Sequence, residues 1–448
     1  MSTLRGYLVN ALGLVAALCL ARYLDIDITV FEGASRLAEE IFERLGPNEE
    51  SMARSCIEAE DEEDTTFICR MSDQDGGHQF EYHTSERCLQ FRAHRVGSET
   101  VLVARLKKVD RDNSFDALSS FVPSSPSSSS TRSYIVPSPS LPPSIVLRPL
   151  RFEDGTVATC DVLIDAAGLQ SRACVVMMGR MVSEAVGQAD ENALAAAAQS
   201  VWSGFVAYRV LISAGKRLRE RAPQHSLLSN PMLYFGKNAC IVGYSIQNSA
   251  CLNVIFFTFD SAQEHGVYPG EWMRKAAKAE FAGAFKRWEP EVQAMLDCVD
   301  GALRWAVHTT KPPGLPTFVH GRTALLGDAA HSMTPFQGSG AGQAVKDAWL
   351  LAHLLGDPSV TRDTIPKALR VYDAARRPVA QDVQERSRFN GHLLALNYRG
   401  IYFEALQGEA QRAALIALGE QMQRNWEWAW STSTDGMVHD SSEALRKL

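Results

Sequence analysis

The clearest chemical pattern in the sequence lies between residues 327 and 348, which read GDAAHSMTPFQGSGAGQAVKDA. Asp328 follows the apolar run Thr323–Leu326 and a glycine, Gly327, that lets the backbone turn. A carboxylate at the carboxyl end of a buried strand can accept hydrogen bonds from the hydroxyl groups of a ligand. The pattern therefore predicts a binding site for a hydroxyl-rich molecule at this strand end.

Three glycines follow within five residues, at Gly338, Gly340 and Gly342. They let a flat ligand approach main-chain N–H groups, and a helix that begins near Gln343 points its positive end at the same place. We therefore expect the ligand to carry or develop negative charge. A tight loop that needs glycine only for its turn is the structural alternative.

This segment resembles the second FAD motif of the flavin-dependent aromatic hydroxylases, the salicylate-hydroxylase-like group A monooxygenases. The resemblance covers most of residues 200–390, including 203–209, 303–322 and 372–388. It implies that Asp328 binds the ribityl chain of FAD and that Pro335 lies close to the flavin ring. It also implies that the amides around Gly340, Ala341 and Gly342 face the pyrimidine edge of that ring.

The amino-terminal third departs from this family pattern. The family begins with a strand and a G-x-G-x-x-G turn that seats the pyrophosphate on a helix. Here Gly13 matches the third glycine, while Leu8 and Asn10 replace the first two; Asn10 tolerates a positive φ. Glu32 ends the second strand, where the family's acid binds the adenosine ribose.

Two further segments match parts of the family pattern. His94–Arg95 resembles a His-Arg pair that contacts the cofactor, which makes Arg95 a candidate. The stretch 160–172 resembles the motif that serves FAD and NAD(P)H, with Gly168 in place but Ala167 where the family has aspartate. We expect either slower reduction by NAD(P)H or a substitute role for Asp165, two residues earlier on the chain.

The resemblance implies an FAD-dependent enzyme that uses NADH or NADPH and O2 to hydroxylate a phenolic or aromatic carboxylic substrate. Arg209 and Tyr208 are our candidates to contact the substrate, with Tyr234 behind them. Two alternatives remain open: a related monooxygenase or epoxidase of secondary metabolism, and a degenerate homologue or faulty gene model that no longer binds FAD. The colour of the purified protein separates the last case from the others.

The composition of the chain argues against several other classes of binding partner. The 448 residues carry a formal net charge of −7 and no Lys/Arg-rich run, which argues against nucleic acid. The nine cysteines contain no C-x-x-C pair, so we expect reduced thiols in a cytoplasmic protein and no metal site. We also expect a monomer or a homodimer. The apolar stretch 7–24 leads into a strand-like segment, so we expect a buried helix and no transmembrane span.

The elements that must position these residues predict an α/β fold: a Rossmann-like FAD-binding domain, a mostly antiparallel substrate domain and C-terminal helices. We assign residues 1–75, 92–180 and 318–372 to the FAD-binding domain, with a disordered Ser/Pro-rich insertion at 119–144. Residues 76–91 and 200–317 form the substrate domain, and 373–448 the helical region. Strand-like segments lie at 203–213, 232–246 and 251–260, and helical periodicity at 185–201, 271–288, 345–355 and most of 364–430.

Overall fold

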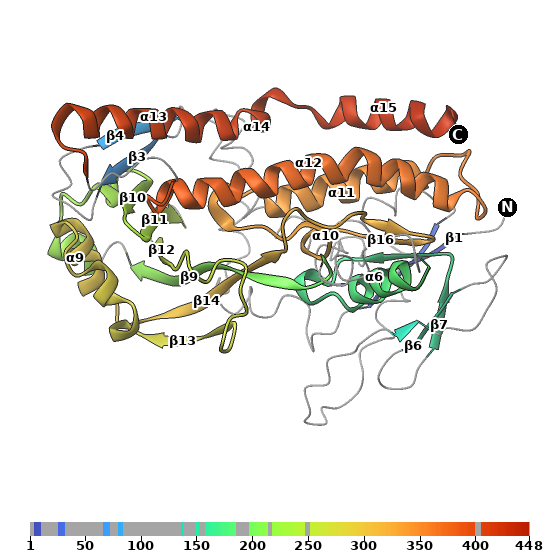
Figure 1. The fold of residues 1–448 in the computed structure, drawn as a ribbon, viewed down its shortest axis with the longest axis horizontal. Helices are drawn as coiled ribbons and strands as arrows, with labels where there is room; N and C mark the ends of the chain where they lie inside the picture. The colour runs from blue at the N-terminus through green and yellow to red at the C-terminus, as the bar shows by residue number, and fades with distance from the viewer. Residues whose placement is uncertain are drawn as a thin grey trace, which may run out of the picture.

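The computed structural model describes residues 4–9, 26–31, 66–71, 79–83, 136–137, 148–151, 157–184, 197–213, 217–246, 251–398 and 405–447. These residues form an α/β fold with two main sheets and a group of C-terminal helices, as predicted (Figure 1).

The first sheet is mainly parallel, with the strand order β15-β16-β8-β1-β2. Its strands are β1 (Leu4–Val9), β2 (Ile26–Phe31), β8 (Val162–Asp165), β15 (Val319–His320) and β16 (Thr323–Leu325). All four residues of β8 are buried, as expected for a parallel strand covered on both faces. Helix α6 (Arg172–Glu184) lies on one face, and α11 (Gly340–Leu355) and α12 (Ile365–Leu394) lie on the other (Figure 1).

The second sheet has eight strands in the order β13-β14-β9-β12-β11-β10-β3-β4. Its strands are β3 (Thr66–Met71), β4 (Gln79–His83), β9 (Ser200–Ser213), β10 (Met232–Gly236), β11 (Ala239–Ile246), β12 (Cys251–Phe259), β13 (Met273–Ala277) and β14 (Gly301–Thr310). Neighbouring strands are antiparallel except β10 and β3. The predicted antiparallel pairing across residues 247–250 is confirmed by β11 and β12.

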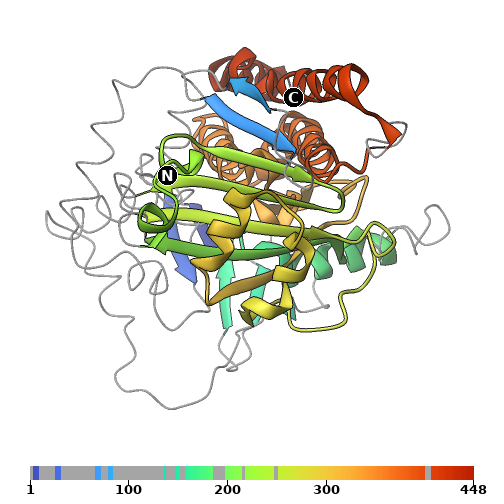
Figure 2. The ribbon, with the colours of Figure 1, turned by 90° about the vertical axis from the view of Figure 1, so that its left-hand side faces the viewer.

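The two faces of this sheet carry separate hydrophobic clusters, because strand side chains alternate. The side that we call the α9 side packs against α9 (Pro290–Asp297) and includes Tyr234 and Phe256. The opposite side, the α12 side, packs against the end of α12 and includes Phe205 and Phe257. Figure 2 shows the segment with α9 in front of the strands.

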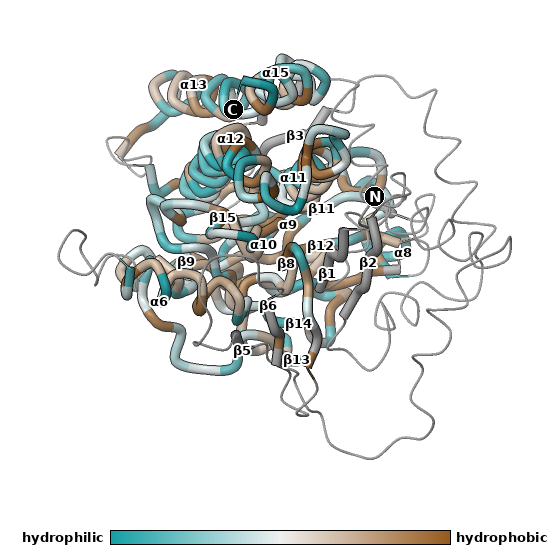
Figure 3. Tube along the Cα trace, turned by 90° about the vertical axis from the view of Figure 1, so that its right-hand side faces the viewer, coloured by the Kyte–Doolittle hydropathy of each residue, from teal (hydrophilic) through white to brown (hydrophobic). Residues whose placement is uncertain are grey.

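The C-terminal helices lie above both sheets. α12 runs along the molecule from the parallel sheet to the eight-stranded sheet, and α13 (Gly408–Trp426), α14 (Trp428–Ser431) and α15 (Thr434–Lys447) follow it (Figure 1). Hydrophilic and hydrophobic residues alternate along these helices, as in amphipathic helices packed on one side (Figure 3).

The helix predicted over 271–288 is wrong. Residues Met273–Ala277 form the edge strand β13, and two 3-10 helices follow, at Lys278–Glu280 and Ala282–Phe285. Phe281, between these two short helices, and Phe285, at the end of the second, are both buried. Pairing with β14 therefore overrides local helix propensity.

Three boundaries also differ from the prediction. Residues 232–246 form two strands with a turn at Lys237–Asn238, rather than one strand. β3 pairs with β10, so the substrate sheet includes residues that we had assigned to the FAD-binding domain. α12 crosses the boundary placed at residue 373.

The remaining predictions on elements fall partly outside the described residues. Within the predicted insertion, Val136–Pro137 form a short strand, β5, against β6 (Arg148–Arg151), which pairs in turn with β7 (Val157–Cys160). Most of the helix predicted at 185–201 lies outside the described ranges, as does the segment after β1. Among the helices that the structure describes, none has the length and apolar character needed to cross a membrane.

Candidate functional site

The carboxyl ends of the four parallel strands lie level with one another. Val9 of β1 pairs with Phe31 of β2 and with Asp165 of β8, and Asp165 pairs with Leu325 of β16. Ligands of open α/β sheets bind outside this edge. The candidate residues Asn10, Gly13, Glu32 and Arg95 lie outside the described residues, although Asn10 and Glu32 directly follow β1 and β2 in the sequence.

The turn after β16 places Asp328 at this edge. Gly327 has φ 61° and ψ −136°, a backbone conformation that is essentially restricted to glycine. Its N–H donates to Asp347 Oδ2 at 3.0 Å, which fixes the turn. Asp328 begins the short helix α10 (Asp328–His331) and is exposed, so its carboxylate can reach a ligand.

The glycine-rich turn brings the start of α11 next to Asp328. A Cβ placed on Gly340 would lie 3.9 Å from Asp328 Oδ1. The Ser339 hydroxyl donates to Gln337 O and makes no capping hydrogen bond with α11, whose first turn has no acidic residue. The N–H groups around Ala341 therefore form an electropositive helix end beside the carboxylate.

The middle motif is fixed by Asp165. Its carboxylate accepts hydrogen bonds from Ala167 N at 2.9 Å and from the Ser171 hydroxyl. Ser171 Oγ in turn accepts from Cys174 N at 2.8 Å at the start of α6. Burial raises the pKa of Asp165, although the hydrogen bonds from Ser171 and Ala167 oppose this rise. Asp165 thus fixes the turn without a carboxylate at position 167.

Gly168 lies in this turn and faces open space. No atom of a described residue lies within 4 Å of the position of a Cβ at Gly168, apart from its chain neighbours. The turn that Asp165 fixes thus leaves room for a ligand at the carboxyl edge of β8.

A buried ionic cluster behind the site was missed by the sequence analysis. Asp347 accepts hydrogen bonds from His331 Nε2 at 2.6 Å and from Arg376 Nε at 2.7 Å, and all three side chains are buried. Arg376 also donates to Gln343 Oε1 at 2.7 Å. The only signal in the sequence is a charged residue inside an apolar helical stripe, VKDAWLLAHLL.

This cluster holds Asp347 in its ionised form. Burial alone would raise the pKa of Asp347, but attraction to His331 and Arg376, with hydrogen bonds from His331 and Gly327, lowers the pKa to about 2. A carboxylate ionised in the core thus anchors the Gly327 turn to α11 and α12.

The structure does not bring the three predicted substrate contacts together. Tyr208 lies on the α9 side, where its ring stacks on Phe281 with centroids 4.7 Å apart. Tyr234 is buried on the same side, and its hydroxyl donates to Glu291 Oε2 at 3.3 Å. Arg209 points to the opposite side, where it is exposed, because neighbouring strand residues alternate.

The loop with Pro335 lies on the same side of the sheet as Arg209. Pro335 is exposed, and the next residue, Phe336, packs against Phe205 and Phe257 of the α12 side, with ring centroids 4.6 Å and 4.9 Å apart. This loop therefore joins the carboxyl edge of the parallel sheet to the α12 side of the second sheet.

The described residues fit the ribityl and ring portions of FAD. Asp328 supplies an exposed acceptor for hydroxyl groups, and the start of α11 supplies uncapped N–H groups for a ring that gains negative charge. Gly168 leaves open space at the neighbouring strand end, and Gly340 has no side chain that would stand between Asp328 and the start of α11. Pro335, Gly338 and Gly342 lie on the same loop and helix end.

Comparison with known proteins also indicates a protein that binds FAD. The model of the family "FAD binding domain" matches residues 304–387. Salicylate hydroxylase of Pseudomonas putida is 33% identical over 303 residues, which are 66% of this chain and 63% of that protein. FAD-dependent monooxygenase str9 of Strobilurus tenacellus is 34% identical over 322 residues, 66% of each chain. The chain thus matches less than two thirds of the length of these relatives.

The fold of this chain is similar to that of solved flavoprotein structures over nearly its whole length. The structure of a salicylate hydroxylase substrate complex superposes with a TM-score of 0.70 at 24% identity and covers 98% of both chains. HpxO of Klebsiella pneumoniae, solved with FAD and uric acid, has a TM-score of 0.57 at 19% identity and covers 98% of this chain and 97% of its own. From the level strand ends, the Asp328 turn and these relatives, we conclude that the chain belongs to the FAD-dependent aromatic hydroxylase family.

Proposed function

We propose that the protein is an FAD-dependent monooxygenase that uses NADH or NADPH and O2 to hydroxylate a phenolic or aromatic carboxylic substrate. The observation that carries this proposal is the position of Asp328, exposed at the common carboxyl edge of the parallel strands beside the uncapped start of α11. Bound FAD supplies hydride acceptance from the nicotinamide and oxygen transfer to the substrate.

The protein's own residues bind and orient the cofactor. Asp328 accepts hydrogen bonds from the ribityl hydroxyls, and the amides of residues 340–342 bind the pyrimidine edge. The positive end of α11 stabilises negative charge on that edge. Pro335 would lie next to the ring, and Phe336, which packs against Phe205 and Phe257, would exclude water from the junction with the sheet.

The α12 side of the sheet supplies a wall for the substrate. Arg209 is exposed there, and its Nε donates to Asn253 Oδ1 at 2.9 Å, which orients the guanidinium. Trp305 and Leu211, 43% and 50% exposed, share this side with Arg209, because Trp305 pairs with Ala207 on β9. An apolar wall with one guanidinium suits an aromatic ring that carries a carboxylate.

A second feature of this wall supports an anionic or hydrogen-bond-accepting substrate. Asn253 is 1% exposed, and its Nδ2 has no hydrogen-bond partner within the part of the chain that the structure describes. A buried donor without a partner costs free energy, which an acceptor atom on a substrate offsets. The names of two relatives, salicylate hydroxylase and 3-amino-4-hydroxybenzoate 2-monooxygenase, describe enzymes for such aromatic acids.

Cofactor binding is the first test of this proposal. The purified chain is expected to be yellow and to release FAD on denaturation. Asp328→Ala is expected to weaken FAD binding by about 1.5–3 kcal/mol, as when a charge-assisted hydrogen bond is lost. Asp382→Asn, an exposed carboxylate of α12, is the matched control and is expected to leave the dissociation constant unchanged. A colourless protein that takes up no added FAD would overturn the proposal.

The substrate class is tested by NAD(P)H oxidation and product analysis with salicylate, hydroxybenzoates and the matching phenols. Arg209→Gln is expected to raise KM for the carboxylates by roughly tenfold or more and to change KM for phenols little. Equal effects on both series would remove Arg209 from substrate recognition. Oxidation of non-aromatic compounds alone would favour the related epoxidase reading. The cytoplasmic location and the monomeric or homodimeric state remain predictions from the sequence.

A further inference from the structure

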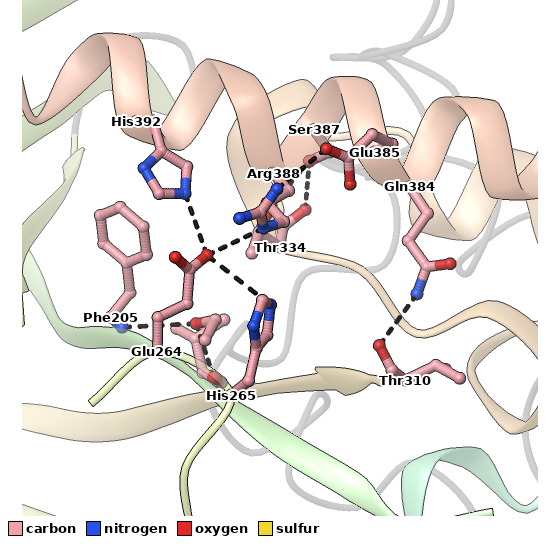
Figure 4. Close-up of polar contacts among 12 residues, drawn as sticks. Phe205, Glu264, His265, Thr310, Thr334, Gln384, Glu385, Ser387, Arg388 and His392 are labelled. Atoms are coloured by element: carbon pink, nitrogen blue, oxygen red, sulfur yellow. Dashed lines mark hydrogen bonds and ion pairs between the residues drawn. The ribbon is translucent and has the colours of Figure 1, made fainter. Parts of the chain in front are cut away.

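Helix α12 contacts two parts of the proposed site: the turn and loop that would hold the cofactor, and the α12 side of the eight-stranded sheet. Its first half contributes Arg376 to the buried cluster behind the Gly327 turn. Its second half faces the loop with Pro335 and the end of the eight-stranded sheet (Figure 4). Any change in the position of this half therefore acts on two separate elements.

The loop of residues 332–338 is fastened to α12 by side chains on one face of the helix. Gln384 Nε2 donates to Ser332 O at 2.7 Å, and Ser387 Oγ donates to Thr334 O at 2.5 Å. Residues three and four apart share a helix face, so Gly391 continues this row. A Cβ at Gly391 would lie 2.5 Å from the Phe336 ring, so the ring packs directly on the helix backbone.

The eight-stranded sheet is fastened to the same part of α12 by one carboxylate. Glu264, on the loop after β12, accepts from Arg388 Nε at 2.8 Å and from His392 Nε2 at 3.0 Å (Figure 4). Its side chain is 14% exposed. Burial alone would raise the pKa of Glu264, but hydrogen bonds from His392 and Arg388 lower the pKa to about 2.

The loop that carries Glu264 is held to the eight-stranded sheet by backbone hydrogen bonds. His265, the next residue, has a positive φ of 66°, a conformation that costs free energy for a non-glycine residue. Its N–H donates to Trp202 O at 2.8 Å, and Trp202 N donates to Gly266 O at 3.0 Å. These two bonds to β9 hold the strained loop in place, so a force on Glu264 reaches the strand that carries Arg209.

We propose that Glu264 is a positioning residue that sets the spacing between the Pro335 loop and the Arg209 side of the sheet by fixing both to α12. This proposal rests on the proposed function, because that spacing is where the substrate must lie over the flavin. Glu264 touches neither the loop nor Arg209 in any described contact, so its effect passes through Arg388 and His392.

The first experiment measures amide hydrogen exchange in the purified full-length chain without added FAD. Glu264→Gln is expected to speed exchange about fivefold to tenfold both in residues 260–266 and in residues 332–338. The matched control is Glu385→Gln. Glu385 binds the same Arg388, at 2.9 Å, but it lies on α12 itself, and within the described residues it makes no hydrogen bond to the sheet. It is expected to leave exchange in both segments unchanged.

Each other outcome overturns the proposal. Faster exchange in residues 260–266 alone means that Glu264 has only a local role. No change in exchange in either segment, or the same change in Glu385→Gln, would show that Glu264 does not link the loop to the sheet. If Glu264→Gln does not fold, His392→Asn, which removes one of the two partners, is expected to give the same paired pattern at smaller size.

A second experiment uses the protein loaded with FAD. Glu264→Gln is expected to leave the FAD dissociation constant within about twofold, while the fraction of NAD(P)H oxidised without hydroxylated product rises about fivefold. An unchanged fraction, or a loss of FAD binding, contradicts the positioning role. Failure of the wild-type chain to bind FAD would overturn the proposed function alone, because the exchange experiment needs no cofactor.

Discussion

Two ionic clusters on α12 look alike in composition but differ in setting. Asp347 lies between His331 and Arg376, and Glu264 lies between His392 and Arg388. The pKa of each carboxylate is lowered to about 2. The first cluster is fully buried within the FAD-binding half, whereas the second is partly exposed and joins the two halves.

Because of this difference, we expect one cluster to act mainly on the stability of the fold and the other mainly on the alignment of the loop and the sheet. Removing one member of a buried pair leaves an uncompensated charge in the core, which costs several kcal/mol. Water reaches Arg388, which is 31% exposed, and can replace a lost partner there at smaller cost. We therefore expect the loss of Asp347 to lower the free energy of unfolding more than the loss of Glu264 does. We expect the loss of Glu264 to affect mainly the spacing between the Pro335 loop and the α12 side of the sheet.

The largest expected effect comes from Asp347→Asn. Loss of the carboxylate leaves Arg376 charged and buried, so the free energy of unfolding is expected to fall by about 3–5 kcal/mol. Urea denaturation of the chain without FAD measures it. Asp382→Asn, from an exposed pair with Arg386, serves as control and is expected to cost about 0.5 kcal/mol or less. A loss for Asp347→Asn no greater than that of Glu264→Gln would break the comparison.

Gly391→Ala tests whether the helix face between the clusters is tightly packed. The new methyl group collides with the Phe336 ring, and overpacking of this kind is expected to cost about 1–3 kcal/mol. Gly436→Ala in α15, where a Cβ meets no described atom within 4 Å, is expected instead to stabilise by up to about 1 kcal/mol. Thermal melting of both variants checks the pair, and equal shifts would show that Phe336 can move away freely.

The smallest effect is the pH dependence of the Glu264 cluster. The pKa of Glu264 is lowered in the folded chain, so its contribution to stability is present above its ordinary value of 4.5 and is lost as pH falls toward 2. The difference in unfolding free energy between wild type and Glu264→Gln is expected to be about 1–2 kcal/mol at pH 6, after allowance for solvent screening. It is expected to shrink as the pH is lowered from 4.5. A difference that stays constant from pH 6 to pH 3 would exclude an ionised Glu264 as its source.

The sequence predicted the features that depend on neighbouring residues. An apolar run, a glycine and an acid place Asp328 at a strand end, and this local order is what the structure has. The parallel pairing of β1 with β2 agrees with the Rossmann-like domain that the sequence predicts. Together these patterns predict the α/β class and the half of the site that we propose binds the ring.

Features that depend on distant partners were beyond such patterns. His331, Asp347 and Arg376 meet across 16 and 29 residues, and Glu264 meets Arg388 across 124, with no helical spacing to signal the contact. Alternation along β9 predicts that Tyr208 and Arg209 face opposite ways, but only the packed sheet shows which side meets the Pro335 loop. Met273–Ala277 likewise became a strand because β14 offered a partner.

The continuity of α12 limits how this molecule can be recombined with its relatives. A designer who transplants the eight-stranded sheet to obtain a new substrate range would cut the chain before residue 318, and so would keep the host's α12. The grafted loop after β12 would then face the host's side chains in place of Arg388 and His392, the two partners of Glu264 in this chain. The exchangeable unit is therefore discontinuous: the sheet together with the second half of α12, from about Gln384 to Leu394.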